Sequence, residues 1–288
     1  MSNVKASPSG EKNKVEKSTL YLVATPIGNL ADLSERAVKV LSEVDFIAAE
    51  DTRNSMRLLS YLGISKPMVS YFEHNKKERG EQIAERLLLG ESCALITDAG
   101  TPAISDPGED MVALCADKGI KVSSVPGPCA AIVALTLSGL PTGRFCFEGF
   151  LSANKSERRK QLSKLSCEER TMIFHEAPHK LKATLEDMQT AFGASRRIAL
   201  CRELTKLNEE AHRTTLEGAV AYYKEHEPRG EYVLVVEGAP EAVESFEEMS
   251  LAEHLESYMA AGMSKKDAIK AVAKDRGVPK NEIYKEFI

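Results

Sequence analysis

The sequence lacks several features that would assign a protein to a class directly. Its longest apolar run, residues 129–137, is far short of the roughly 20 residues that cross a bilayer. The six cysteines are scattered and include no CxxC pair, so we expect reduced thiols in a cytoplasmic protein and no metal site. Neither GxxxxGK[ST] nor GxGxxG occurs, which excludes a P-loop and the usual dinucleotide-binding loop.

The chain also has no excess of positive charge, and this limits how it can bind nucleic acid. The sequence has 38 Lys and Arg against 43 Asp and Glu, a net charge of −5. A largely electrostatic nucleic-acid binder is usually basic, so such a partner must meet a local patch. The best candidate is residues 154–164, NKSERRKQLSK, where one acid stands among five basic residues, Lys155, Arg158, Arg159, Lys160 and Lys164. The alternative is a solvated helix face without a ligand.

The order of apolar runs and turn signals predicts two α/β domains and a helical segment. We expect a disordered polar tail over residues 1–17, an N-terminal domain over 18–137, a second over 138–240 and a small helical domain over 241–288. In the first domain, short apolar runs alternate with amphipathic stretches, and Ser34 is a candidate N-cap. That alternation predicts a parallel, doubly wound sheet.

Strands and helices can be placed by their residue ranges. In the first domain we expect strands at 19–24, 45–49, 68–72, 92–97 and 120–125, and helices at 35–44, 53–62, 76–89 and 109–118. In the second domain we expect strands at 145–150, 171–175, 198–202 and 232–237, with helices between them. Three short helices, at 251–261, 265–276 and 279–287, should follow.

Three Gly- and Pro-rich loops follow predicted strands, at residues 25–29, 98–108 and 125–128. In an open parallel sheet, ligands bind outside the carboxyl ends of the strands, where glycine lets backbone approach them closely. Ordinary strand–helix turns are the alternative. The second loop is acidic, which suits a cationic or polar small molecule better than a pyrophosphate.

Six motifs, in order, closely resemble one family. They are TPIGNL at 25–30, AEDTR at 49–53, HN at 74–75, TDAGTPAISDPG at 97–108, VPGP at 125–128 and HEAP at 175–178. Together they resemble the ribosomal RNA small subunit methyltransferase I family, within the tetrapyrrole-methylase superfamily, over residues 19–240. The C-terminal segment resembles the small helical domain that these proteins often carry, with an RNA, docking or dimer role left open.

The resemblance implies a fold, a cofactor and a reaction. It implies a tetrapyrrole-methylase-like fold with S-adenosylmethionine in the cleft between two α/β domains. It also implies a homodimer that methylates a cytidine 2′-hydroxyl in the decoding region of 16S rRNA, with the small ribosomal subunit as the partner. The cofactor residues that it implies here are Pro26, Asp98, Ala99, Gly100, Ile104, Ser105, Cys129, Ala130, Phe174, Ala239 and Pro240. TPIGNL and DAGTP depart from the loops of the tetrapyrrole methylases, which argues against a tetrapyrrole substrate.

The acceptor side is expected in the first domain, just after its strands. A ribose hydroxyl is a poor nucleophile, so a base would help, and the candidates are Glu50, Asp51 and His74. Arg53 and Asn75 are candidates for substrate binding. Asp51 could instead cap a helix, and a lone histidine is more often structural.

Two other functions stay open from the sequence. One is a methylase of the same fold that acts on a tetrapyrrole or a protein side chain. The other is a ribosome-associated module that binds S-adenosylmethionine without catalysis.

Overall fold

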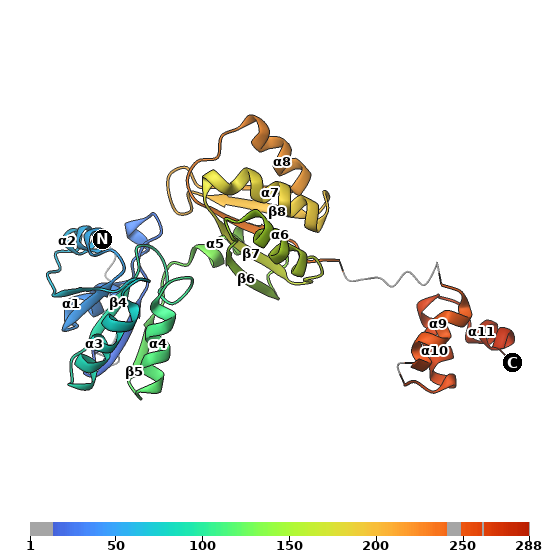
Figure 1. Cartoon of the computed structure of the whole chain (residues 1–288), viewed down its shortest axis with the longest axis horizontal. Coiled ribbons are helices and arrows are strands. Elements are labelled where there is room, and N and C mark those ends of the chain that lie inside the picture. The colour runs from blue at the N-terminus through green and yellow to red at the C-terminus, as the bar shows by residue number, and fades with distance from the viewer. Residues whose placement is uncertain (1–13, 241–248, 261, 288) are drawn as a thin grey trace, which may run out of the picture. The chain divides into compact units, whose positions relative to one another are not determined.

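The computed structural model describes residues 14–240, 249–260 and 262–287 (Figure 1). They form two compact units, and the chain passes from the first to the second between Gly238 and Ala239. Most of the expected tail and the acidic stretch 241–248 lie outside the described residues. Residues 14–17 pack on the first sheet instead of joining a tail, because the Glu16 backbone N–H donates to the Tyr21 hydroxyl at 2.8 Å. The boundary expected at residue 137 falls inside the first unit and stays a prediction.

The first sheet is parallel throughout, as the alternating pattern predicts. Its strand order is β3-β2-β4-β1-β5. The strands are β1 (Thr19–Val23), β2 (Phe46–Ala49), β3 (Met68–Ser70), β4 (Cys93–Ile96) and β5 (Lys121–Val125). Every residue of β2 and β4 is buried, since helices cover both faces of the sheet. Two-sided burial explains why these strands read as continuous apolar runs.

Helices on both faces make the first sheet doubly wound (Figure 1). α1 (Glu35–Glu43) and α2 (Thr52–Tyr61) pack on one face through Leu41 and Leu59. α3 (Lys76–Leu88) and α4 (Gly108–Asp117) pack on the other through Ile83 and Met111. Ser34 caps α1 as expected, because its hydroxyl accepts the Ala37 N–H at 3.1 Å. A short 3₁₀ turn, η1 (Leu30–Asp32), leads from β1 to α1.

The second sheet is mixed, with strand order β6-β7-β10-β8-β9. Only the pair β6–β7 is parallel among its described strands. The strands are β6 (Phe145–Phe150), β7 (Thr171–Glu176), β8 (Arg197–Arg202), β9 (Glu210–Thr215) and β10 (Tyr232–Val236). The sequence analysis missed β9. Its residues EAHRTT form a half-buried edge strand without an apolar run, so periodicity gave no signal.

Helices also cover both faces of the second sheet. α5 (Ala130–Leu137) packs on one face, through Ala134 and Leu135. The opposite face is covered by α6 (Lys155–Lys164), α7 (Pro178–Phe192) and α8 (Leu216–Glu225). α5 therefore lies on the face that does not carry the other three helices.

The second compact unit is helical, as predicted. It contains α9 (Leu251–Ala260), α10 (Lys265–Asp275) and α11 (Lys280–Phe287). Its small core includes Leu255, Ile269, Val272 and Ile283. None of the helices in the described parts of the chain is long and apolar enough to span a membrane.

A buried ion pair joins α6 to α7 and corrects one expectation. Arg158, which we expected on an RNA-binding face, is only 5% exposed. Its Nε and Nη2 donate to Oδ2 of Asp187 at 2.9 and 2.7 Å, and Arg159 Nε donates to the other carboxylate oxygen at 2.7 Å. Arg158 and Leu162 stand four residues apart and share the inner face of α6. Charge alone suggested a uniform basic face, whereas the helical period turns Arg158 inward.

We predict that Asp187→Ala destabilises the protein because it leaves the Arg158 guanidinium buried without its partner. The loss should be about 3–5 kcal/mol in the free energy of unfolding, measured by urea titration. Glu227→Ala is the control, since it breaks an exposed pair with Lys182 and should cost at most about 1 kcal/mol. Equal losses in the two variants would contradict the structural role of the buried pair.

Stability should also depend on pH through Asp187. Burial alone would raise the pKa of Asp187, but the hydrogen bonds from Arg159 and Arg158 outweigh burial and lower it. A carboxyl group whose pKa is lowered by folding stabilises the protein above its unfolded pKa, about 3.9. That contribution disappears as pH falls through the folded value. The wild type should therefore lose stability below about pH 4, and Asp187→Ala should lose less.

Candidate functional site

A pocket of about 520 Å³ lies where the loops of the first sheet meet the second sheet. From the first region it is lined by Ile27, Glu50 and the loop after β4, residues 97–101 and 104–106. The start of α5 contributes Cys129 to Ala131. From the second region come Phe150, His175, Glu176, Cys201, Glu203, Leu204, Lys206 and residues 230–233. This volume lies within the range of small-molecule sites.

The three predicted loops are bound to one another at this pocket. Thr25 and Gly100 exchange two backbone hydrogen bonds, with N···O distances of 2.9 and 3.1 Å. The Thr101 hydroxyl donates to the carbonyl of Pro128 at 2.9 Å, which attaches the third loop. Gly100 has a φ of +88°, a left-handed conformation that favours glycine. The loop after β4 is therefore held in place by both of its neighbours.

Seven of the eleven expected cofactor residues line the pocket. They are Asp98, Ala99, Gly100, Ile104, Ser105, Cys129 and Ala130. Pro26 is not a lining residue, although its neighbour Ile27 is. Ala239 and Pro240 begin the second compact unit and are not lining residues either.

Phe174 is placed differently from its expected position beside the ligand. It is fully buried in the core between the second sheet and helices α6, α7 and α8. Side chains alternate between the two faces of a strand, so its neighbour His175 lines the pocket instead. The strand β7 therefore reaches the pocket through His175, one residue after the expected Phe174.

Acidic side chains dominate the first-sheet side of the pocket. Burial raises the pKa of Glu50, and the nearby carboxylates of Asp98 and Asp106 raise it further. Asp106 organises the loop, because its carboxylate accepts the N–H groups of Ala103, Ile104 and Gly108 at 2.8–3.0 Å. Asp98 accepts a hydrogen bond from Asn54 on α2 at 3.2 Å. An anionic wall of this kind favours a ligand that carries positive charge.

The other expected acceptor residues lie outside the pocket lining. Asp51 caps α2, because its carboxylate accepts the Arg53 N–H at 2.8 Å, and the Arg53 guanidinium binds the same carboxylate. Asn75 holds the turn after β3 by accepting the Phe72 N–H at 2.8 Å. His74 is exposed and makes an edge contact with Phe72. Of the three proposed catalytic groups, the structure brings Glu50 alone to the pocket lining.

Most of the pocket's second-sheet side was missed by the sequence analysis. The loop that contains Glu203, Leu204 and Lys206 belongs to none of the Gly- and Pro-rich clusters. It closes tightly on the first loop, since a Cβ on Gly28 would lie 2.6 Å from Lys206 Cγ and 2.9 Å from the Leu204 carbonyl oxygen. Glu203 and Thr205 both have positive φ, an uncommon conformation for residues other than glycine. Strain of this kind is visible only in the folded chain.

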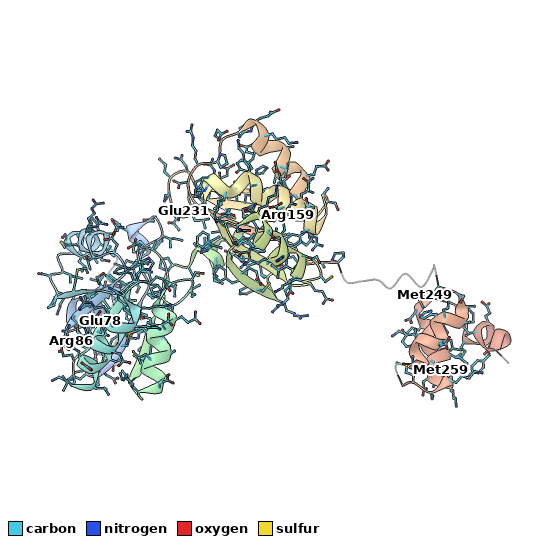
Figure 2. The ribbon with its side chains drawn as sticks, in the orientation of Figure 1. Glu78, Arg86, Arg159, Glu231, Met249 and Met259 are labelled. Carbon is cyan, nitrogen blue, oxygen red and sulfur yellow. The ribbon has the colours of Figure 1, made fainter. Side chains whose placement is uncertain are left out.

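The exposed face of α6 carries the remaining basic residues. Lys155, Arg159 and Lys160, with Ser156 and Ser163, line a second depression in the surface. Arg159 is labelled in Figure 2, as is Glu231, which lines the first pocket. Asn154 begins the helix by accepting the N–H groups of Ser156 and Glu157 at 2.9 and 3.2 Å. Within the described residues, no cluster of His, Cys, Asp and Glu is suited to hold a metal ion.

Comparison with known proteins agrees with this geometry. The family model for tetrapyrrole (corrin/porphyrin) methylases matches residues 19–220. Among solved structures, diphthine synthase gives a TM-score of 0.59 at 15% identity, over 76% of this chain and 90% of that one. A uroporphyrin-III C-methyl transferase from Thermus thermophilus, complexed with S-adenyl homocysteine, gives 0.53 at 17%, over 76% and 97%. At these identities the likeness establishes the fold alone.

Curated relatives are much more similar, and each is named ribosomal RNA small subunit methyltransferase I. The protein from Halalkalibacterium halodurans is 49% identical over 93% of this chain and 94% of its own length. That from Synechocystis is 48% identical over 92% and 95%, and that from Escherichia coli O157:H7 is 44% identical over 92% and 93%. At this identity and coverage, and with the family model matching residues 19–220, this chain belongs to the ribosomal RNA small subunit methyltransferase I family of the tetrapyrrole methylases.

Proposed function

We propose that this S-adenosylmethionine-dependent rRNA methyltransferase acts on a cytidine 2′-hydroxyl in the decoding region of 16S rRNA. The observation that supports the proposal best is the acid-rich pocket between the two α/β regions, with a basic helix face on the second region. The pocket suits the cofactor and the helix face suits the RNA.

The residues of the pocket fit S-adenosylmethionine by size and by charge. When bound, this cofactor supplies an electrophilic methyl group on a positively charged sulfur. Asp98, Asp106 and Glu50 provide the negative charge that favours such a cation. Gly100 lets backbone approach the ligand, and Ala99 and Ala130 leave room beside it.

Glu50 is the proposed proton acceptor for the ribose hydroxyl. Its burial and its acidic neighbours raise its pKa, which makes the carboxylate a stronger base than an exposed glutamate. Positioning of donor and acceptor supplies the remainder of the acceleration.

The reaction can be tested directly with tritium-labelled S-adenosylmethionine. Naked 16S rRNA, small subunits lacking the methyl group and whole ribosomes should be compared as acceptors. We expect label in small subunits, recovered after nuclease digestion as 2′-O-methylcytidine. Label on a nucleobase or on ribosomal protein would contradict the proposed acceptor, and binding without turnover would favour a non-catalytic module.

We propose that the protein acts in the cytoplasm as a homodimer, following the family resemblance. Sedimentation equilibrium should give twice the chain mass. A single-chain mass at micromolar concentration would contradict the dimer.

We predict that Gly100→Arg weakens S-adenosylmethionine binding at least roughly tenfold, because a large side chain would enter the pocket from a left-handed position. Isothermal calorimetry measures the change. Gly90→Arg is the matched control, since Gly90 also has positive φ, at +100°, but no atom lies within 4 Å of an added Cβ. A folded Gly100→Arg protein with unchanged affinity would remove this loop from the site.

We predict that Glu50→Gln lowers turnover on saturating small subunits by roughly 10²–10⁴-fold, because glutamine cannot accept the proton. In the wild type, the rate should fall as pH drops through the raised pKa of Glu50, above the usual value of about 4.3. The variant should lack this acidic limb, while its S-adenosylmethionine affinity changes little. Asp51→Asn and His74→Ala serve as comparisons, and we expect little change in rate because neither residue lines the pocket. An identical pH profile in Glu50→Gln would exclude Glu50 as the base.

We predict that replacing Lys155, Arg159 and Lys160 by glutamine weakens binding of small subunits without changing cofactor affinity. The slope of log affinity against log salt should decrease by about 2–3, since each phosphate contact contributes roughly 0.7–0.9. The control replaces Lys39, Lys182 and Lys224 by glutamine, which changes the net charge equally on other surfaces. If both triple variants show the same slope, the α6 face does not bind RNA.

A further inference from the structure

We infer that Phe150 is a stacking platform that holds the nucleobase of the acceptor nucleotide at the pocket entrance. This inference rests on the proposed function, because it assigns a role in holding the RNA substrate of the same site. Three observations support the inference. A bulge turns Phe150 toward the pocket, the ring of Phe150 is exposed, and the pocket around that ring is mainly acidic.

A bulge in β6 determines the direction of Phe150. The β6–β7 register pairs Phe147 with Ile173 and Phe150 with His175, and it shifts by one residue between Phe147 and Gly149. In a regular strand, Phe147 and Phe150 would lie on opposite faces, since side chains alternate. The extra residue places both rings on the face where His175 lines the pocket. Bulges often re-aim a side chain beside a functional site.

The ring of Phe150 is exposed, yet its neighbours hold it in one orientation. It lines the pocket with 55% of its surface accessible. The His175 ring meets it edge-on at 5.3 Å, and Lys180 Nζ lies 5.6 Å from its centroid. Lys180 is fixed in turn by Glu176 at 3.0 Å. An exposed aromatic ring held in this way offers a preformed stacking surface, and RNA-binding proteins commonly stack unpaired bases on such rings.

Charge decides which part of the RNA reaches Phe150. Among the described residues that line the pocket, one, Lys206, is basic and six are acidic, Glu50, Asp98, Asp106, Glu176, Glu203 and Glu231. Burial lowers the pKa of His175, so that side chain adds no positive charge near neutral pH. Phosphates are repelled from this wall, whereas an uncharged base and ribose can enter. Four residues beyond Phe150, Asn154 begins α6, whose basic face can hold the phosphates outside.

The first experiment measures methyl transfer to small subunits by Phe150→Leu and Phe150→Tyr. Stacking by one aromatic ring is worth enough to change kcat/KM by roughly tenfold or more. We expect that loss in Phe150→Leu and recovery in Phe150→Tyr, which keeps the ring. Phe145→Leu is the matched control, since Phe145 is 39% exposed at the other end of β6 and does not line the pocket. Thermal unfolding confirms that each variant is folded.

A second experiment separates the RNA base from the adenine of the cofactor. The chain contains no tryptophan, so Phe150→Trp introduces a single fluorescent reporter at the platform. Saturating S-adenosylhomocysteine should change the emission of this tryptophan no more than it changes the emission of a Phe145→Trp control. Strong quenching at position 150 alone would mean that the cofactor adenine stacks there, and would overturn the inference.

Failure of the inference differs from failure of the proposed function. If the wild type methylates small subunits and Phe150→Leu does so equally well, the platform is wrong and the function stands. If the wild type forms no 2′-O-methylcytidine, the proposed function fails.

Discussion

The pairing of Thr25 with Gly100 is the contact on which the site depends. Parallel strands bring the loops after β1 and β4 to the same edge of the first sheet, and two backbone hydrogen bonds then fix one loop against the other. The pairing needs a left-handed residue at position 100, where glycine is favoured. Asp106 holds the remainder of the long loop through three N–H groups. Hydrogen bonds of backbone groups therefore hold in place the loop that carries Asp98 and Asp106.

The two α/β regions contribute different chemistry to the same pocket. The first supplies backbone and carboxylates from loops, which suit a small cationic ligand. The second supplies the face of a mixed sheet, with Phe150 and His175 side by side, and the tight loop of Leu204 and Lys206 against Gly28. Its helix α6 divides its charges between two tasks. Arg158 and Arg159 both bind Asp187 on α7, while Lys155, Lys160 and the exposed part of Arg159 line the surface depression.

Sites of this kind place strong constraints on a few positions. Glu50 is half-buried beside two other carboxylates, an arrangement that costs stability unless a cation or proton compensates it. Ala103, Ser105, Glu203 and Thr205 adopt left-handed conformations in loops around the pocket. Strained backbone and like charges are concentrated around the pocket, whereas the sheets beneath it are regular and apolar.

The sequence by itself determined the first sheet, the three joined loops and the family. Buried parallel strands leave uninterrupted apolar runs, and loops that approach a ligand need Gly and Pro, so both features can be read locally. Only the tertiary structure decided which face a side chain occupies. Phe174 lies in the core while His175 lines the pocket, Arg158 turns inward, and Asp51 caps α2 instead of facing the pocket. A shift of one residue reverses the face of a strand, and residues 203–206 reach Gly28 only when both regions pack together.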